Sequence, residues 1–135
     1  MGSTAAARSF RDLVVWQRSI QLATAVYRLT GDFPREEMFG LTSQMRRSTV
    51  SVASNIAEGQ GRLTTGEFRL FLGIARGANL EVQTQIEIAR ALGFGKEGPI
   101  AEAESLSQEV GKMINAILKS TQARIKNHAP RTSEH

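Results

Sequence analysis

Apolar residues recur along most of this chain at intervals of three and four positions, the spacing that places side chains on one face of an α-helix. The first such series predicts a helix over residues 11–30. Gly31 follows it directly, and glycine is common just past a helix C-terminus. The members of the first series are Leu13, Trp16, Ile20, Ala23 and Tyr27. No segment alternates with period two over a useful length, so no strand is expected.

The second series predicts a helix over residues 35–58. Pro34 suits the first position of a helical turn. Gly40 is expected either to break the initial turn from the main helix or to bend the helix there, and Gly59 and Gly61 are expected to end it. The apolar stripe consists of Leu41, Met45, Ser48, Val52 and Ile56.

Two further helices complete the pattern. Thr64 and Glu67 have the spacing of a capping box, which predicts that a third helix covers residues 65–92 and stops at Gly93. Gly98-Pro99 begins the fourth helix in the favoured arrangement, with proline in the first turn. The stripe of the fourth helix contains Leu106, Val110, Met113 and Ile117.

These elements predict an all-α fold, an antiparallel up-down-up-down four-helix bundle, because short loops join successive helices. Residues 10–126 are expected to form the bundle. Residues 1–9 and 127–135 carry no pattern and are expected to be disordered.

The predicted third helix carries apolar residues on two sides. In a flat four-helix bundle only one side of a helix is covered, so the second stripe predicts a homo-oligomer, with this helix and the first helix lining the interface. The alternative is that these residues are scattered apolar positions on the surface. The second stripe consists of Leu70, Ile74, Ala78, Ile88 and Leu92.

Composition narrows the function. The chain has 135 residues, 41% hydrophobic and 22% charged, which is an ordinary balance for one globular domain. It has no cysteine, which excludes disulfides, thiolate metal sites and a cysteine nucleophile. No apolar run approaches the roughly 20 residues of a membrane helix. The N-terminus lacks the apolar core of a signal peptide, so a cytoplasmic protein without membrane contact is expected.

Catalytic chemistry finds little support. His128 and His135 are the only histidines, and both fall in the predicted tail, so the folded part has no histidine base. Metal-binding motifs are missing as well, including the Glu-x-x-His of di-iron bundles. Glutamates on predicted helices could pair as acid and base, but solvated carboxylates are the simpler interpretation: Glu58, Glu67, Glu81 and Glu87. We therefore expect no enzyme, no cofactor and no small-molecule substrate.

Adjacent arginines are the sharpest functional candidates. Arg46 and Arg47 cannot both face the core, because neighbouring helical residues diverge by about 100°. The net charge of +4 and a pI of about 10.1 are a mild indication of nucleic-acid binding. The candidate phosphate-binding residues are Arg46, Arg47, Arg62, Arg69 and Arg76. The alternative is an ion pair of Arg46 or Arg47, within the subunit or across an interface, with Glu58, Glu67 or Glu81.

Three segments together carry a family resemblance. They are Asp12-Leu13-x-Val15-Trp16, FGLTSQMRRSTVSVASNIAEGQGR and EFRLFLGIARGANLEVQTQIEIARALGF. Over about residues 10–118 the chain resembles the small four-helix-bundle family that is encoded in intervening sequences of bacterial 23S rRNA genes and often labelled S23 ribosomal protein. Its sequence departs from the residues common in the family at Ser48-Thr49 and Val52-Ala53.

The resemblance implies an antiparallel four-helix bundle that assembles as a ring-like homopentamer. It implies no established biochemical role. A related protein, the accessory variability determinant of diversity-generating retroelements, has the same bundle and is understood to bind nucleic acid and a reverse transcriptase. The function expected here is a non-enzymatic oligomer that binds RNA or another nucleic acid through a basic surface. The alternative is a structural or protein-interaction module with no nucleic-acid role.

Overall fold

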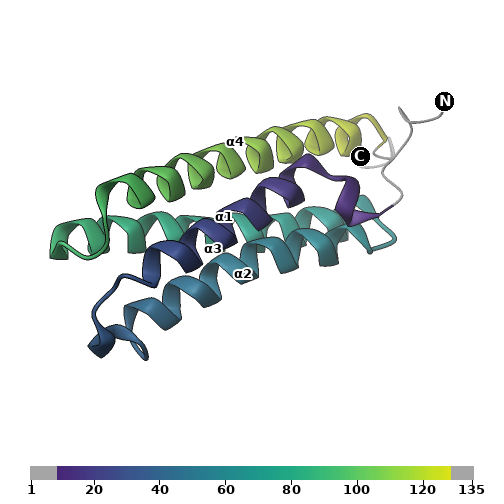
Figure 1. The fold of residues 1–135 in the computed structure, drawn as a ribbon. Helices are drawn as coiled ribbons and strands as arrows, with labels where there is room; N and C mark the ends of the chain where they lie inside the picture. The colour runs from purple at the N-terminus through teal and green to yellow at the C-terminus, as the bar shows by residue number, and fades with distance from the viewer. Residues whose placement is uncertain (1–8, 129–135) are drawn as a thin grey trace.

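A computed structural model of the chain describes the backbone of residues 9–128 and the side chains of residues 9–123. The predictions of disorder for residues 1–8 and 129–135 lie outside this range. Within it the chain is helical and forms no strand (Figure 1). The elements are the 3-10 turns η2 (Phe10–Asp12) and η3 (Arg35–Glu37) and the helices α1 (Val14–Thr30), α2 (Leu41–Gln60), α3 (Thr65–Leu92) and α4 (Glu97–His128).

The four helices form the predicted bundle. Successive helices run in opposite directions, with the α1–α2 and α3–α4 connections at one end and the α2–α3 turn at the other (Figure 1). Helix α1 packs against α2 and α4, and helix α3 packs against the same two helices. No contacts join the described residues of α1 and α3, which therefore stand diagonally across the core. The all-α, up-down-up-down prediction is confirmed.

The first predicted helix starts too early in the chain. Residues Phe10–Asp12 form a separate 3-10 turn, in which the Ser9 hydroxyl accepts a hydrogen bond from the Arg11 amide at 2.9 Å. Leu13 is extended, with φ −77° and ψ 124°, so α1 begins at Val14. Local capping by Ser9, which the apolar period does not report, explains the difference.

The second predicted helix is two elements. Gly40 has φ −113° and ψ −116°, which is outside helical geometry, so the 3-10 turn η3 and helix α2 are separated there. The start of α2 is capped by the preceding turn, because Glu37 Oε1 accepts a hydrogen bond from the Leu41 amide at 3.0 Å. Of the two outcomes expected at Gly40, the structure has the break rather than the bend.

Gly59 does not end α2, contrary to prediction. It is buried inside the last turn of the helix, and Gly61 is the capping residue. A Cβ atom at Gly59 would lie 2.9 Å from Cβ of Phe71 and 3.2 Å from Cδ1 of Phe68. This glycine is needed for the close approach of α2 and α3 rather than for a helix stop.

The third helix has the predicted bounds, Thr65–Leu92, and the predicted caps. The Thr64 hydroxyl accepts a hydrogen bond from the Glu67 amide at 3.1 Å. Gly93 closes the helix in the left-handed conformation, φ 74°. The fourth helix begins one residue before Gly98 and continues to His128, two residues past the predicted end of the bundle.

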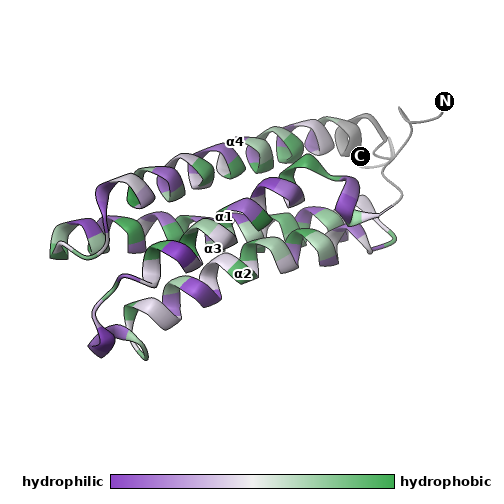
Figure 2. Cartoon of the chain, viewed as in Figure 1, coloured by the Kyte–Doolittle hydropathy of each residue, from purple (hydrophilic) through white to green (hydrophobic). Residues whose placement is uncertain are grey.

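One hydrophobic core runs the length of the bundle. Hydrophobic and hydrophilic residues alternate in short runs along each helix, as expected of helices with one covered side (Figure 2). Ala78, predicted in the outer stripe of α3, is only 7% exposed and belongs to the core. The largest fully buried apolar side chains are Leu22, Leu29, Met45, Ile56, Leu72, Ile86 and Ile114.

The described residues contain neither a membrane-spanning helix nor a metal-binding cluster. No helix among them is long and apolar enough to span a membrane. In the same part of the chain, no group of three or more histidine, cysteine or acidic side chains is arranged to hold a metal ion.

Candidate interaction surface

The outer side of helices α2 and α3 carries a shallow groove of about 690 Å³. The two helices are joined by a short turn and pack closely along their length, and the groove follows the line between them. Its walls combine apolar side chains with hydroxyls, amides and one opposed pair of charges. The lining side chains include Gln44, Arg47, Ser48 and Ser51 from α2 and Leu80, Glu81, Thr84, Gln85 and Ile88 from α3.

A row of polar side chains crosses the floor of this groove. Gln85 Nε2 donates a hydrogen bond to Ser48 Oγ at 3.1 Å, and Ser48 Oγ lies 3.4 Å from Glu81 Oε1, to which it donates. The Gln85 side chain is only 9% exposed, yet its Oε1 atom has no hydrogen-bond partner among the described residues. A buried acceptor without a donor is costly. The exposed acceptor of the row is the Glu81 carboxylate, which remains open to a donor from outside the chain.

Apolar side chains on α3 flank the polar row. Leu80 is 46% exposed and Ile88 45%, and they lie beside the groove on the side of α3 that faces away from the core. Leu70 and Ile74 extend the exposed stripe toward the N-terminus of α3. Between them Gly73 would meet nothing within 4 Å if it carried a Cβ atom, and Gly77 is equally open. An exposed apolar stripe of this length is typical of a contact surface.

A second hollow, of about 680 Å³, lies on the other side of α2. It is mainly apolar and reaches the α1–α2 connection. Arg47 and Ser51 line both hollows, so Arg47 stands on the ridge between them. The apolar lining comprises Tyr27, Met38, Phe39 and Val50.

The predicted arginines do not form one patch. Arg46 is used within the bundle: its Nε donates to Thr30 Oγ1 at 2.9 Å, and its guanidinium lies 4.7 Å from the ring centre of Tyr27. Nη2 also reaches the Tyr27 carbonyl at 3.5 Å. Arg46 therefore serves the C-terminal end of α1, where carbonyl groups are free and a cation is favourable.

Arg69 and Arg76 face helix α4 instead. Arg69 Nη1 donates to the Leu118 carbonyl and to Thr121 Oγ1, the latter at 2.7 Å. Arg76 Nε donates to Asn115 Oδ1 at 2.9 Å. These two side chains fasten α3 to α4 on the side of the bundle away from the groove.

Arg62 lies in the α2–α3 turn. Its Nη2 atom is 3.2 Å from Glu58 Oε2, and its guanidinium lies 4.5 Å from the ring centre of Phe71. The exposed i,i+4 pair is typical of solvent-facing helix ends.

Arg47 is the one predicted site residue whose side chain makes no hydrogen bond or ion pair within the described part of the chain. The alternative prediction, an ion pair of Arg46 or Arg47 with Glu58, Glu67 or Glu81, is not formed inside the subunit. Glu58 pairs with Arg62, and Glu81 accepts from Ser48.

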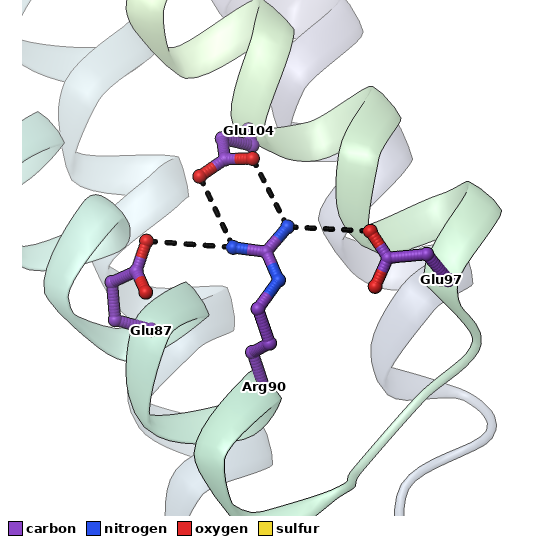
Figure 3. Close-up of polar contacts among 4 residues, drawn as sticks. All are labelled: Glu87, Arg90, Glu97 and Glu104. Carbon is purple, nitrogen blue, oxygen red and sulfur yellow. Dashed lines mark hydrogen bonds and ion pairs between the residues drawn. The ribbon is translucent and has the colours of Figure 1, made fainter.

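Charged side chains also cluster where α3 ends and α4 begins. Arg90 reaches Glu87 on its own helix and two carboxylates of α4, Glu97 and Glu104 (Figure 3). Its two terminal nitrogens contact both oxygens of Glu104, at 3.2 and 3.0 Å. The hydrogen bond from Arg90 holds the pKa of the Glu104 carboxyl below its usual value near 4.5. The same bond raises the pKa of Arg90, so this cluster is a clamp between helices rather than an open site.

Sequence reasoning missed Gln85. The residue falls on the flank of the α3 core stripe, and a glutamine at such a position is indistinguishable from a solvated one until its neighbours are known. The same holds for Ser48, which the periodicity assigned to the apolar stripe of the second helix.

Comparisons with known proteins agree on the family and the fold. The model of the family described as 23S rRNA-intervening sequence protein matches residues 11–116. A crystal structure of a protein of unknown function from the S23 ribosomal protein family, from Bacteroides thetaiotaomicron VPI-5482, is similar with a TM-score of 0.71. It is 22% identical, and the alignment covers 78% of this chain and 99% of that one. A comparison with curated protein sequences found no match.

Proposed function

This chain belongs to the family of 23S rRNA-intervening sequence proteins, and from that premise we propose that it is a non-enzymatic cytoplasmic protein that assembles with copies of itself through the α2–α3 groove. The number of copies expected from the family resemblance is five. The family itself has no established function, so the proposal rests on the surface of this chain.

The exposed apolar stripe of α3 carries the proposal. Leu70, Ile74, Leu80 and Ile88 all lie on the side of α3 that the other three helices leave uncovered. Fully burying an exposed apolar side chain contributes about 1.5–3 kcal/mol. These four side chains are about half exposed, so each can contribute roughly half of that amount, and four together can sustain association. Obligate interfaces resemble a core cut in half, which describes this stripe and its glycines.

The chemistry of the groove supports the non-enzymatic part of the proposal. The contact between the Ser48 hydroxyl and the Glu81 carboxylate is 3.4 Å long, and the hydroxyl also accepts a hydrogen bond from the Gln85 amide. Such a row, in which the polar groups bond one another, is suited to recognising a partner.

The test is the size of the protein in solution, measured by size-exclusion chromatography with light scattering. Leu80→Glu/Ile88→Glu places charge in the stripe and is expected to convert the assembly to monomers with an unchanged helical spectrum. Leu63→Glu is the matched control, since Leu63 is 98% exposed in the α2–α3 turn and lies outside helix α3. A wild-type chain that stays monomeric at high micromolar concentration would overturn the proposal.

Nucleic-acid binding is the second candidate, and the free guanidinium of Arg47 favours it. A symmetric assembly repeats this cation in every copy, which strengthens a weak local field. Binding to phosphate should then weaken steeply with added salt.

Retention of a structured RNA by the wild-type assembly, measured against salt concentration, tests this candidate. Arg47→Ala is expected to reduce the slope of log K against log salt by about one for each phosphate group that the guanidinium no longer neutralises. Arg35→Ala, an exposed arginine of the η3 turn, is the control and should leave the slope unchanged. Absence of salt-sensitive retention in the wild type would remove the candidate, while self-association could still stand.

A further inference from the structure

We propose that the surface covering the α2–α3 groove is the outward side of α1 from a second copy of this chain, joined by an ion pair between Arg28 and Glu81. The inference rests on the self-association proposed above and specifies which faces meet.

Topology supplies the first step. Helices α1 and α3 make no contact within the described chain and stand diagonally, so their outward sides point away from each other. When α1 of one copy pairs with α3 of the next, the first copy still has its α3 face uncovered and the second copy still has its α1 face uncovered. Such a head-to-tail contact repeats until the copies close into a ring or extend as a filament.

Contacts inside the subunit set the register. Arg46 is bonded to Thr30, which places these residues at one level along the bundle. Helices α1 and α2 are antiparallel, so Arg28 lies level with Ser48, two residues further along. Ser48 in turn contacts Glu81 and Gln85. In a neighbour related by rotation about an axis along the bundle, Arg28 therefore arrives at the level of Glu81 and Gln85.

The same register matches the apolar positions. Helices α1 and α3 run in the same direction. If residue 28 of one copy lies beside residue 83 of the next, every other residue of α1 lies beside the α3 residue that is about 55 positions later in the sequence. Exposed apolar residues of α1 then fall beside exposed apolar residues of α3. Within two positions of this spacing, the expected neighbours are Val14 with Leu70, Ile20 with Ile74, and Tyr27 with Leu80.

Charge and hydrogen bonding agree with this pairing. Arg28 is exposed, and its side chain has no partner in the part of the chain that the structure describes. Opposite it, the exposed Glu81 carboxylate accepts, among the described residues, only the 3.4 Å bond from Ser48. A guanidinium has five N–H donors in a fixed fork, enough to bond both oxygens of the carboxylate at once.

Disulfide trapping tests the pairing directly, because the chain contains no cysteine of its own. Ile20→Cys/Ile74→Cys places one thiol on each face. The two cannot join within a subunit, since α1 and α3 do not contact each other. We expect oxidation to produce a ladder of covalent dimers and higher multimers, whereas either single variant stays uncrosslinked.

Two results would overturn the inference while leaving self-association intact. One is efficient dimerisation of Ile74→Cys alone, which indicates that α3 meets α3. The other is a double variant that still assembles by light scattering but forms no disulfide ladder. A wild-type chain that is monomeric would overturn both proposals.

Charge exchange tests the ion pair. Arg28→Glu and Glu81→Arg should each raise the dissociation constant of the assembly at least tenfold, because each places like charges opposite one another. The double exchange should restore most of the affinity. Restoration is not expected for Arg47→Glu/Glu81→Arg, in which the exchanged cation comes from α2. Failure of the first double exchange to restore assembly, or equal restoration by the second, would contradict the pair.

Discussion

At the scale of single residues, two neighbouring arginines have different roles. Arg46 and Arg47 are adjacent, but their directions around α2 differ by about 100°. Arg46 turns toward α1 and bonds Thr30, whereas Arg47 points outward between two hollows. The sequence suggested that the two arginines belong to one site. In the structure, Arg46 makes bonds within the bundle and Arg47 lies on the surface.

Arg46→Ala should therefore lower the free energy of unfolding, by about 1–2 kcal/mol for one hydrogen bond and one cation–π contact. Arg47→Ala should change it by less than about 0.5 kcal/mol, as expected of an exposed side chain without such contacts. Urea unfolding followed by circular dichroism measures both. Equal losses of unfolding free energy for the two variants would mean that the contacts of Arg46 do not stabilise the fold.

Asn79 and Ser107 form a reciprocal pair in the core. Asn79 Nδ2 donates to the Ser107 carbonyl at 2.9 Å, and Ser107 Oγ donates to Asn79 Oδ1 at 2.8 Å. Both residues are buried, so the pair fixes the register of α3 against α4. The periodicity of the sequence does not indicate it, because neither residue is apolar.

Asn79→Ala should cost about 1–3 kcal/mol of unfolding free energy, since it leaves a buried hydroxyl without its acceptor. Adding Ser107→Ala should cost little more, because the unsatisfied group is then removed as well. A double-mutant cycle in urea measures the coupling. Additive losses would indicate that the two side chains act independently.

At the scale of elements, spacing of apolar residues was sufficient to identify all four helices and their order. It left a break and a bend at Gly40 open, and it failed at Gly59. Gly40 separates the initial turn from α2 because its backbone leaves helical geometry, and Gly59 continues the helix because α3 packs against it. The outcome at Gly59 depends on what α3 places across the interface, which spacing along one helix does not contain.

Gly59→Ala is expected to destabilise the bundle by about 1–3 kcal/mol, since a methyl group would collide with Phe71. Gly73→Ala is the matched control, because the space around Gly73 is open and alanine favours a helix by about 0.5–1 kcal/mol. Thermal unfolding in the Leu80→Glu/Ile88→Glu background separates this effect from assembly. Stabilisation by both substitutions would contradict the close approach of α2 and α3.

The junction of α3 and α4 should be sensitive to acid. Because Arg90 lowers the pKa of Glu104 below its usual value near 4.5, the folded state holds this proton less tightly than the unfolded state. The contribution is thus present above the unfolded pKa and is lost as the pH falls through the folded one. The difference in Tm between wild type and Glu104→Gln should shrink as pH decreases from 7 to 3. A constant difference would exclude the linkage.

At the scale of the whole molecule, the sequence indicated an uncovered stripe on α3 but could not say how the site arginines are distributed. Arg69 and Arg76 on α3 bond side chains of α4, whereas Arg47 on α2 lines the groove on the outer side of α2 and α3. A basic surface built from all five predicted arginines therefore does not exist within one subunit.

If copies cover the stripe, stability should depend on concentration. Tm is expected to rise as the protein is concentrated, since association favours the folded state by mass action. Leu80→Glu/Ile88→Glu should abolish this dependence. Calorimetry over a hundredfold range of concentration provides the measurement, and a Tm that is constant for the wild type would argue against assembly.

An even number of antiparallel helices returns the chain to the end where it began, and the start of α1 and the end of α4 lie together at that end (Figure 1). In any assembly of parallel copies, every fused tag or domain would crowd a single rim. The opposite rim, made of the α1–α2 and α3–α4 connections, would remain open for immobilisation or labelling. The topology of one bundle thus gives the whole particle two chemically distinct ends.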